Sequence, residues 1–150
     1  MNSAKTWPLQ TIARAAEVTP ACLRQWFGTG VLHLRGNDKK STGSGHKVGL
    51  SRERAYEAAF VQHLNRFDVK VSRAARAAFE FTLSGNSGRA AGQLFPLGRT
   101  VLVLTPTGAV VANVDFDSRA SDLSNCGVAI VVDCNKIIAD IDAVLDSPTK

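Results

Sequence analysis

Residues 7–32 read WPLQTIARAAEVTPACLRQWFGTGVL and decide the fold of the N-terminal half. Apolar residues recur at helical spacing from Leu9 to Ala16, and the pair Thr19-Pro20 then supplies an N-cap followed by proline at the first helical position. Glycines at 28 and 30 end the second pattern. The sequence therefore predicts two short helices joined by a tight turn, which is the order of a helix-turn-helix motif.

The second of these helices carries side chains suited to DNA. Leu23, Cys22 and either Trp26 or Phe27 are expected to face the protein, which leaves the remaining positions toward solvent. Arginine and glutamine form hydrogen bonds with base edges and phosphates. The predicted DNA contacts from this helix are Thr19, Ala21, Arg24 and Gln25.

The pattern changes abruptly after this motif. Residues 31–35 and 46–48 are short extended segments on either side of a tip rich in Gly, Asn, Asp, Ser and Lys, which predicts a β-hairpin with an exposed turn. A flexible basic hairpin beside a helix-turn-helix commonly meets the phosphate backbone or the minor groove, as a wing does. The alternative is a solvated, disordered loop. The basic residues assigned to the hairpin are Arg35, Lys39, Lys40 and Lys47.

Two further helices are predicted after the hairpin. Ser51 can cap a helix that runs to about Asn65, and Ser72 can cap an alanine-rich helix that Gly85 stops. Arginines at the start of the first helix are candidate phosphate contacts, although isolated helical arginines are more often solvated charges without a partner. These two candidates are Arg52 and Arg54.

This order of elements resembles the DNA-binding domain of the MerR family of bacterial transcription regulators. The matching segments are Leu9–Ala13, Thr19–Trp26, Gly30–Leu32 and Leu64–Phe67, and the correspondence covers about half of the chain. The resemblance implies a winged helix-turn-helix. It also places Thr19, Arg24 and Gln25 on the recognition helix, and Lys39, Lys40 and Lys47 on the wing.

The chain also departs from this family. Gln25-Trp26 stands where the family usually has two tyrosines, the wing is longer, and a long C-terminal dimerisation helix is not evident. Effector sensing is therefore not implied, and the effector remains unknown. Excisionases and small phage DNA-packaging proteins contain similar modules, so the resemblance favours DNA binding more than it favours regulation.

The C-terminal part predicts a separate small unit. Residues 84–98 are a plausible linker, and strands are expected at 100–105, 109–114 and 127–133, followed by a helix over 135–145. A three-stranded sheet with one helix would leave one sheet face open. We therefore expect a homodimer formed through this half.

Charge is distributed unevenly along the chain. Residues 1–99 contain 15 Lys and Arg against 6 Asp and Glu, whereas residues 100–150 contain 3 against 7. A basic segment binds a polyanion by neutralising phosphates and releasing their counterions. The N-terminal part is thus expected to bind DNA, and the acidic part to face elsewhere.

Composition excludes several other classes. No apolar run approaches the roughly 20 residues of a membrane span, and no secretory signal is evident, so a cytoplasmic protein without membrane contact is expected. Three cysteines at irregular spacing indicate neither a disulfide framework nor a zinc site. No nucleophile or base stands at a motif spacing, and no calcium loop is matched by the spacing of Asp115, Asp117, Asp122, Asp133, Asp140 and Asp142. No metal, cofactor or enzymatic activity is therefore expected.

The sequence thus predicts an α+β protein with three segments. These are a MerR-like winged helix-turn-helix over 1–83, a linker over 84–98 and a small dimerisation or effector unit over 99–150. The expected function is sequence-specific binding of double-stranded DNA as a homodimeric transcription regulator. The alternatives are an excisionase-like or packaging-like architectural protein and a protein-interaction adaptor that does not bind DNA.

Overall fold

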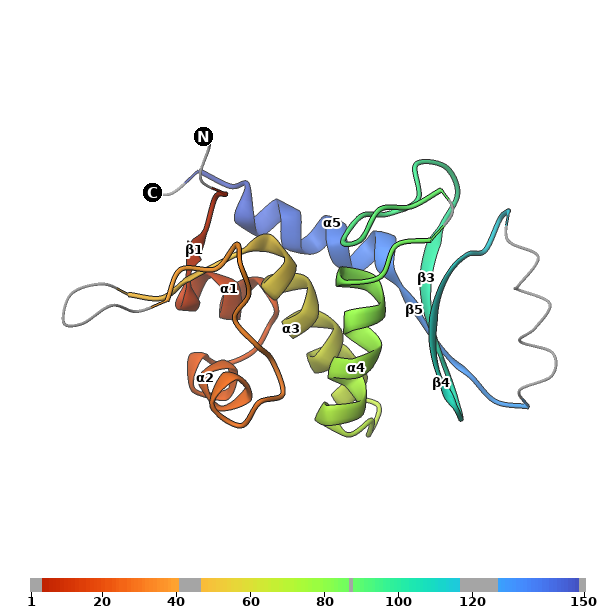
Figure 1. Ribbon diagram of the computed structural model, residues 1–150, viewed down its shortest axis with the longest axis horizontal. Helices are drawn as coiled ribbons and strands as arrows, with labels where there is room; N and C mark the ends of the chain where they lie inside the picture. Colours follow the sequence, from red (N-terminus) through yellow and green to blue (C-terminus); the bar gives the residue numbers. More distant parts are fainter. Residues whose placement is uncertain (1–3, 41–46, 87, 117–126, 149–150) are drawn as a thin grey trace. The chain divides into compact units, whose positions relative to one another are not determined.

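The computed structural model describes residues 4–40, 47–86, 88–116 and 127–148, and it combines helices with small antiparallel sheets (Figure 1). The predicted α+β class is confirmed at this level. The chain forms two compact units: the first contains Met1–Ala75 together with Asp140–Lys150, and the second contains Arg76–Ala139. These units differ from the predicted segments 1–83 and 99–150, because the end of the C-terminal helix belongs to the first unit.

The first unit begins with the two predicted short helices, α1 (Leu9–Ala15) and α2 (Pro20–Gly28). The predicted cap is confirmed, since the Thr19 hydroxyl accepts a hydrogen bond from the Cys22 amide at 3.1 Å. Between the helices, Glu17 adopts a left-handed φ of 59°, which is uncommon for a residue other than glycine. Its carbonyl accepts a hydrogen bond from Gln62 at 3.1 Å, so the turn is fixed to the following helix.

Two longer helices follow, α3 (Arg52–Asn65) and α4 (Val71–Thr82), close to the predicted positions. Nine of the 14 residues of α3 are buried, so this helix forms the centre of the first unit. A charged residue on such a helix must find a partner inside the protein. The boundary between the two units falls within α4, after Ala75.

The segment predicted as a hairpin pairs differently from the expectation. Residues 31–35 form no strand, and instead β2 (Gly49–Leu50) pairs antiparallel with β1 (Trp7–Pro8). A Cβ at position 49 would lie 2.7 Å from the Thr6 hydroxyl oxygen, so glycine permits the N-terminal strand to approach. A separate bridge joins Lys39 to Gly49. Residues 41–45 of the predicted tip, and residue 46 of the second predicted extended segment, lie outside the described residues.

The second unit contains the three predicted strands, β3 (Thr100–Thr105), β4 (Gly108–Asn113) and β5 (Ile130–Asp133), in the order β4-β3-β5. Helix α5 (Cys134–Leu145) follows β5 directly and ends in the first unit. Apolar residues recur along this helix at helical spacing and are buried, namely Ile137, Ile138, Ile141 and Leu145.

The expectation of an open sheet face is wrong for the central strand. On β3, Leu102 is fully buried on one face, while Val101 and Val103 are buried on the other. The latter two form an apolar cluster with Ala112, and the partly buried Val110 packs against it. On the neighbouring strand β5, Val131 is 54% exposed.

Residues in the predicted linker are held within the second unit by Arg89. This side chain is 6% exposed, and its guanidinium donates hydrogen bonds to five backbone carbonyls. Two of these belong to Glu80 and Phe81 near the end of α4, where a cation also interacts favourably with the helix dipole. Across the described residues, no helix is long and apolar enough to cross a membrane.

Candidate nucleic-acid interface

The excess of positive charge belongs entirely to the first unit. By sequence, this unit contains 13 Lys and Arg against 8 Asp and Glu, whereas the second unit contains 5 of each. A polyanionic partner would therefore be attracted to the first unit.

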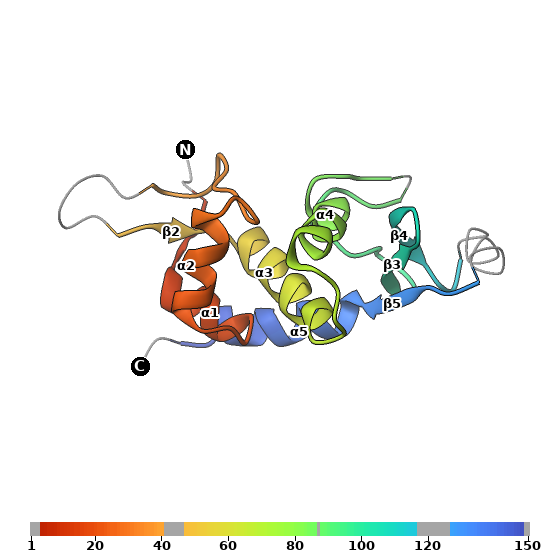
Figure 2. The same cartoon turned by 90° about the horizontal axis from the view of Figure 1, so that it is seen from below.

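Helix α2 presents the side chains that the sequence assigned to solvent. Leu23 and Trp26 are buried with exposed fractions of 0% and 5%, and Cys22 and Phe27 are partly buried. The opposite side of the helix is exposed, and Figure 2 shows α2 lying beside α1. All four candidates on this helix are exposed, namely Thr19, Ala21, Arg24 and Gln25.

A loop from Lys39 to Gly49 carries further exposed cations and is closed at its base. The Lys39 amide donates to the Gly49 carbonyl at 2.7 Å, and the Gly49 amide donates back at 2.9 Å. One residue earlier, Asp38 accepts from the amides of Arg35 at 2.8 Å and Ser51 at 2.7 Å. The ends of the loop are thus fixed relative to the start of α3, and the exposed candidates on it are Lys39, Lys40 and Lys47.

Arg54, a candidate phosphate contact, lies in the core instead. It is 3% exposed and donates to the His33 carbonyl at 3.0 Å. Its guanidinium also lies 3.3 Å from Glu57 and 3.8 Å from Asp38. Arg35 is partly exposed and lies 3.8 Å from the same Glu57 carboxylate. We call Arg35, Asp38, Arg54 and Glu57 the buried charge cluster. Arg54 therefore stabilises the core and is not exposed on the surface as Arg24 of α2 is.

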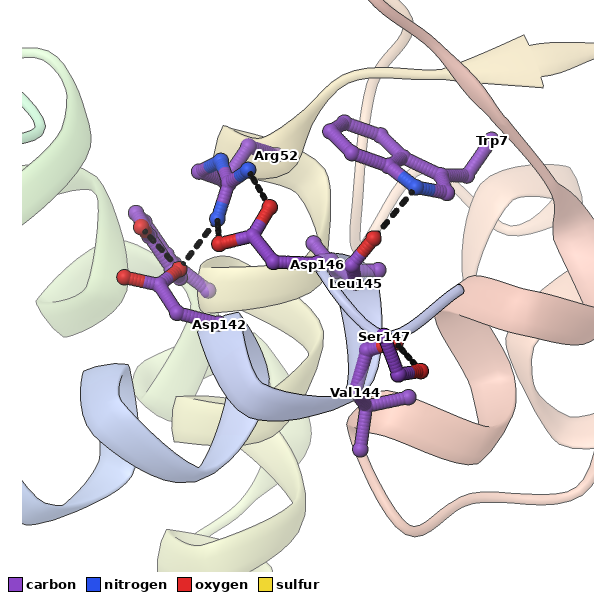
Figure 3. Close-up of polar contacts among 8 residues, drawn as sticks. Trp7, Arg52, Asp142, Val144, Leu145, Asp146 and Ser147 are labelled. Atoms are coloured by element: carbon purple, nitrogen blue, oxygen red, sulfur yellow. Dashed lines mark hydrogen bonds and ion pairs between the residues drawn. The ribbon is translucent and has the colours of Figure 1, made fainter. Parts of the chain in front are cut away.

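Arg52, the other arginine assigned to phosphate, is bound by the C-terminal segment (Figure 3). Its guanidinium contacts Asp142 at 2.5 Å and Asp146 at 2.6 Å, and it lies 5.1 Å from the centre of the Trp7 ring. The Trp7 indole N–H donates to the Leu145 carbonyl at 3.1 Å. We call these contacts the C-terminal clasp. Two carboxylates of the acidic C-terminal part thus neutralise Arg52 within the basic unit, so Arg52 is not an unpaired cation as the sequence suggested.

The clasp changes the ionisation of its own members. The hydrogen bond from Arg52 lowers the pKa of Asp146 below its ordinary value of 3.8. Burial raises the pKa of Tyr56, and so does its hydrogen bond to Asp142 at 2.8 Å. Asp146 thus stays charged and paired with Arg52. Tyr56 stays neutral and donates its hydroxyl proton to the Asp142 carboxylate, which also contacts Arg52.

The clasp predicts an acid-dependent loss of stability that Asp146→Asn removes. A carboxylate whose pKa is lower in the folded state stabilises the protein above the unfolded-state pKa, and this contribution is lost as the pH falls through the folded value. We expect the free energy of unfolding of the wild-type chain to exceed that of Asp146→Asn by more at about pH 6 than at about pH 3, since the difference shrinks as the pH falls below the ordinary aspartate pKa of 3.8. Urea unfolding at both pH values measures this, and a constant difference would contradict it.

Sequence reasoning missed the clasp, although one signal was present. Asp142 and Asp146 are four residues apart, so they lie on the same side of α5. Like charges at this spacing destabilise an isolated helix by a few tenths of a kcal/mol, which indicates that a cation from elsewhere compensates them. Nothing in the sequence alone identified Arg52 as that cation.

No known family model and no curated protein matches the chain. Among the described residues, no group of three or more His, Cys, Asp and Glu side chains is arranged to hold a metal ion. The candidate site is therefore defined by its own geometry, as an exposed polar helix face and a basic loop on one positively charged unit.

Proposed function

We propose that this chain is a sequence-specific double-stranded DNA-binding protein of the winged helix-turn-helix type, acting in the bacterial cytoplasm as a MerR-like, homodimeric transcription regulator. In this proposal α1 and α2 are the helix-turn-helix, α2 enters the major groove, and the Lys39–Gly49 loop contacts the backbone as a wing.

One observation carries the proposal. The first unit displays Arg24 and Gln25 on the exposed face of helix α2, which is capped by Thr19 and buries Leu23 and Trp26 on its other side. The same unit contains a loop whose base is fixed by Asp38. Rigid presentation matters because base readout requires donors held in a defined geometry, whereas phosphate contacts tolerate mobile lysines. An adaptor for an acidic protein would need the charge but not this presentation.

A selection from random duplex DNA with the full chain tests the proposal. Enrichment of one motif, bound more tightly than scrambled competitor at two salt concentrations, would support a specific regulator, and a two-fold-symmetric motif would support the homodimer. Salt-sensitive binding without a motif would favour the architectural alternative. No binding to duplex DNA would favour the adaptor.

Arg24→Ala is expected to reduce discrimination between the selected site and its single-base variants by about 1–3 kcal/mol, if Arg24 reads a base edge. Competition binding with a panel of mutated sites measures the discrimination. Arg76→Ala is the control, because Arg76 is an exposed helical arginine in the second unit. If both variants discriminate between the sites equally well, Arg24 does not contact a base.

The double substitution of Lys39 and Lys40 by alanine is expected to weaken binding to all sequences alike. Each lost phosphate contact lowers the slope of log K against log salt by about 0.9, so a slope smaller by up to about 2 is expected. Titrations at several salt concentrations measure the slope. An unchanged slope would show that the loop does not contact DNA, even if α2 does.

A further inference from the structure

A shallow groove lies in the first unit, between its N-terminal strand and the end of α5. Lys5, Trp7 and Arg14 belong to one wall, and Leu145 and Ser147 belong to the other. Trp7 and Leu145 face each other in Figure 3, where the indole N–H meets the carbonyl, and Ser147 lies on the same turn. Both walls belong to one compact unit, so the groove is a property of that unit.

The lining of the groove is cationic and apolar. Among the described residues that line it, Lys5 and Arg14 are the charged ones, and none is a carboxylate. The Lys5 ammonium lies 5.0 Å from the centre of the Trp7 ring, and its charge contributes to the lowered pKa of Asp146 nearby. Arg14 is exposed and forms no ion pair with any described residue. An anion in the groove could therefore pair with the guanidinium of Arg14 and the ammonium of Lys5.

The remaining lining adds hydroxyl groups and apolar surface. Thr11 and Ser147 supply hydroxyls, and the Ser147 hydroxyl, which donates to the Val144 carbonyl at 2.7 Å, retains its capacity to accept. Pro8 and Pro148 contribute exposed apolar edges. Small-molecule sites commonly combine apolar walls with a few polar groups that fix orientation.

We infer that this groove binds a small organic anion, with a phosphate or carboxylate group held by Lys5 and Arg14 and an apolar body against the exposed Pro8 and Pro148, beside Trp7. A ligand there would touch both sides of the C-terminal clasp. It would thereby stabilise the end of α5 on the first unit, by binding the folded form and not the unfolded one. The inference does not depend on whether α2 binds DNA.

Phenyl phosphate is a suitable probe, because it joins a phosphate to an apolar ring. The chain has two tryptophans, so Trp26→Phe leaves Trp7 as the only indole, and its fluorescence reports on the groove. We expect a saturable change with phenyl phosphate and none with benzyl alcohol, which lacks the anion. Arg14→Gln is expected to weaken binding about tenfold, since a charge-assisted hydrogen bond is lost, and Arg76→Gln in the second unit should leave it unchanged.

Three results would overturn the inference. The first is no saturation at about 20 mM phenyl phosphate, above the millimolar dissociation constant expected for a small ligand. The second is equal weakening by Arg14→Gln and Arg76→Gln. The third is displacement of phenyl phosphate by a duplex, which would make the groove a contact for backbone phosphate. If Trp26→Phe does not fold, the Trp7 indole N–H resonance of the wild-type chain gives the same titration.

Discussion

A chain that ends after Ala139 is expected to lose the fold of the first unit, although residues 1–75 are all present. Ile141 and Leu145 are 1% and 3% exposed and belong to this unit. Removing one large buried aliphatic side chain typically costs about 2–5 kcal/mol, so removing both costs about 4–10 kcal/mol. This is comparable with the whole stability of a small domain, about 5–15 kcal/mol.

The truncation also breaks the C-terminal clasp. The Trp7 indole N–H loses its acceptor, the Leu145 carbonyl, and Trp7 is only 8% exposed. A buried donor left without a partner adds a cost of about 1–3 kcal/mol. Arg52 would also lose its ion pairs with Asp142 and Asp146. These ion pairs are partly exposed, so their loss lowers the free energy of unfolding by less than the loss of the buried residues does.

Far-UV circular dichroism and urea unfolding measure this effect. The matched control is a chain that ends after Ser147, which retains the clasp and both buried aliphatic residues. Leu145→Ala in the full chain gives an intermediate case, with an expected loss of about 2–5 kcal/mol. A fragment 1–83 as stable as the full chain would contradict the prediction and would restore the segment boundaries expected from sequence.

The elements of the fold were predictable because their signals are local. The Thr19-Pro20 cap, the apolar side of α5 and the two-residue connection Pro106-Thr107 between β3 and β4 each depend on residues close in sequence. The exposed face of α2 was predictable for the same reason, since helical periodicity fixes which side chains point away from Leu23 and Trp26.

The errors concern pairings between distant residues. Gly49–Leu50 pairs with Trp7–Pro8 across about 40 residues, and no periodicity distinguishes this partner from the nearer segment 31–35. Arg54 and Arg52 are also two residues apart on one helix and equally basic in sequence. Arg54 is buried against Glu57, three residues further along the same helix. Arg52 is instead held by Asp142, which lies 90 residues away in the sequence, and helical periodicity does not identify such a distant partner.

The second large effect is expected from Glu57→Gln, which removes a carboxylate from the buried charge cluster. Glu57 is fully buried and lies 3.3 Å from Arg54, which is itself 3% exposed. The substitution leaves two arginines beside the single carboxylate of Asp38, and breaking a buried ion pair typically costs about 3–5 kcal/mol. Urea unfolding measures the loss. Glu53→Gln, on the same helix but only partly buried, is the control and should change stability by less than about 1 kcal/mol.

A double variant separates the cost of a broken pair from the value of the pair itself. Arg54→Met combined with Glu57→Leu replaces both charges by apolar groups, and such replacements are often neutral or stabilising. We expect it to be more stable than Glu57→Gln alone. Asp38 would remain satisfied by the amides of Arg35 and Ser51. If the double variant is as unstable as the single one, the cluster stabilises the fold through its hydrogen bonds and not merely by charge compensation.

The cluster also determines how firmly the Lys39–Gly49 loop is held. Arg54 bonds the His33 carbonyl before the loop and lies near Asp38 at its base, so the apolar double variant removes these contacts while keeping the core filled. Hydrogen exchange of the Lys39 and Gly49 amides should accelerate in that variant even where global stability is recovered. Unchanged exchange would show that Asp38 and the β1–β2 pairing hold the ends of the loop without Arg54. The charge of Arg54 would then have no role in positioning Lys39 and the other lysines of the loop.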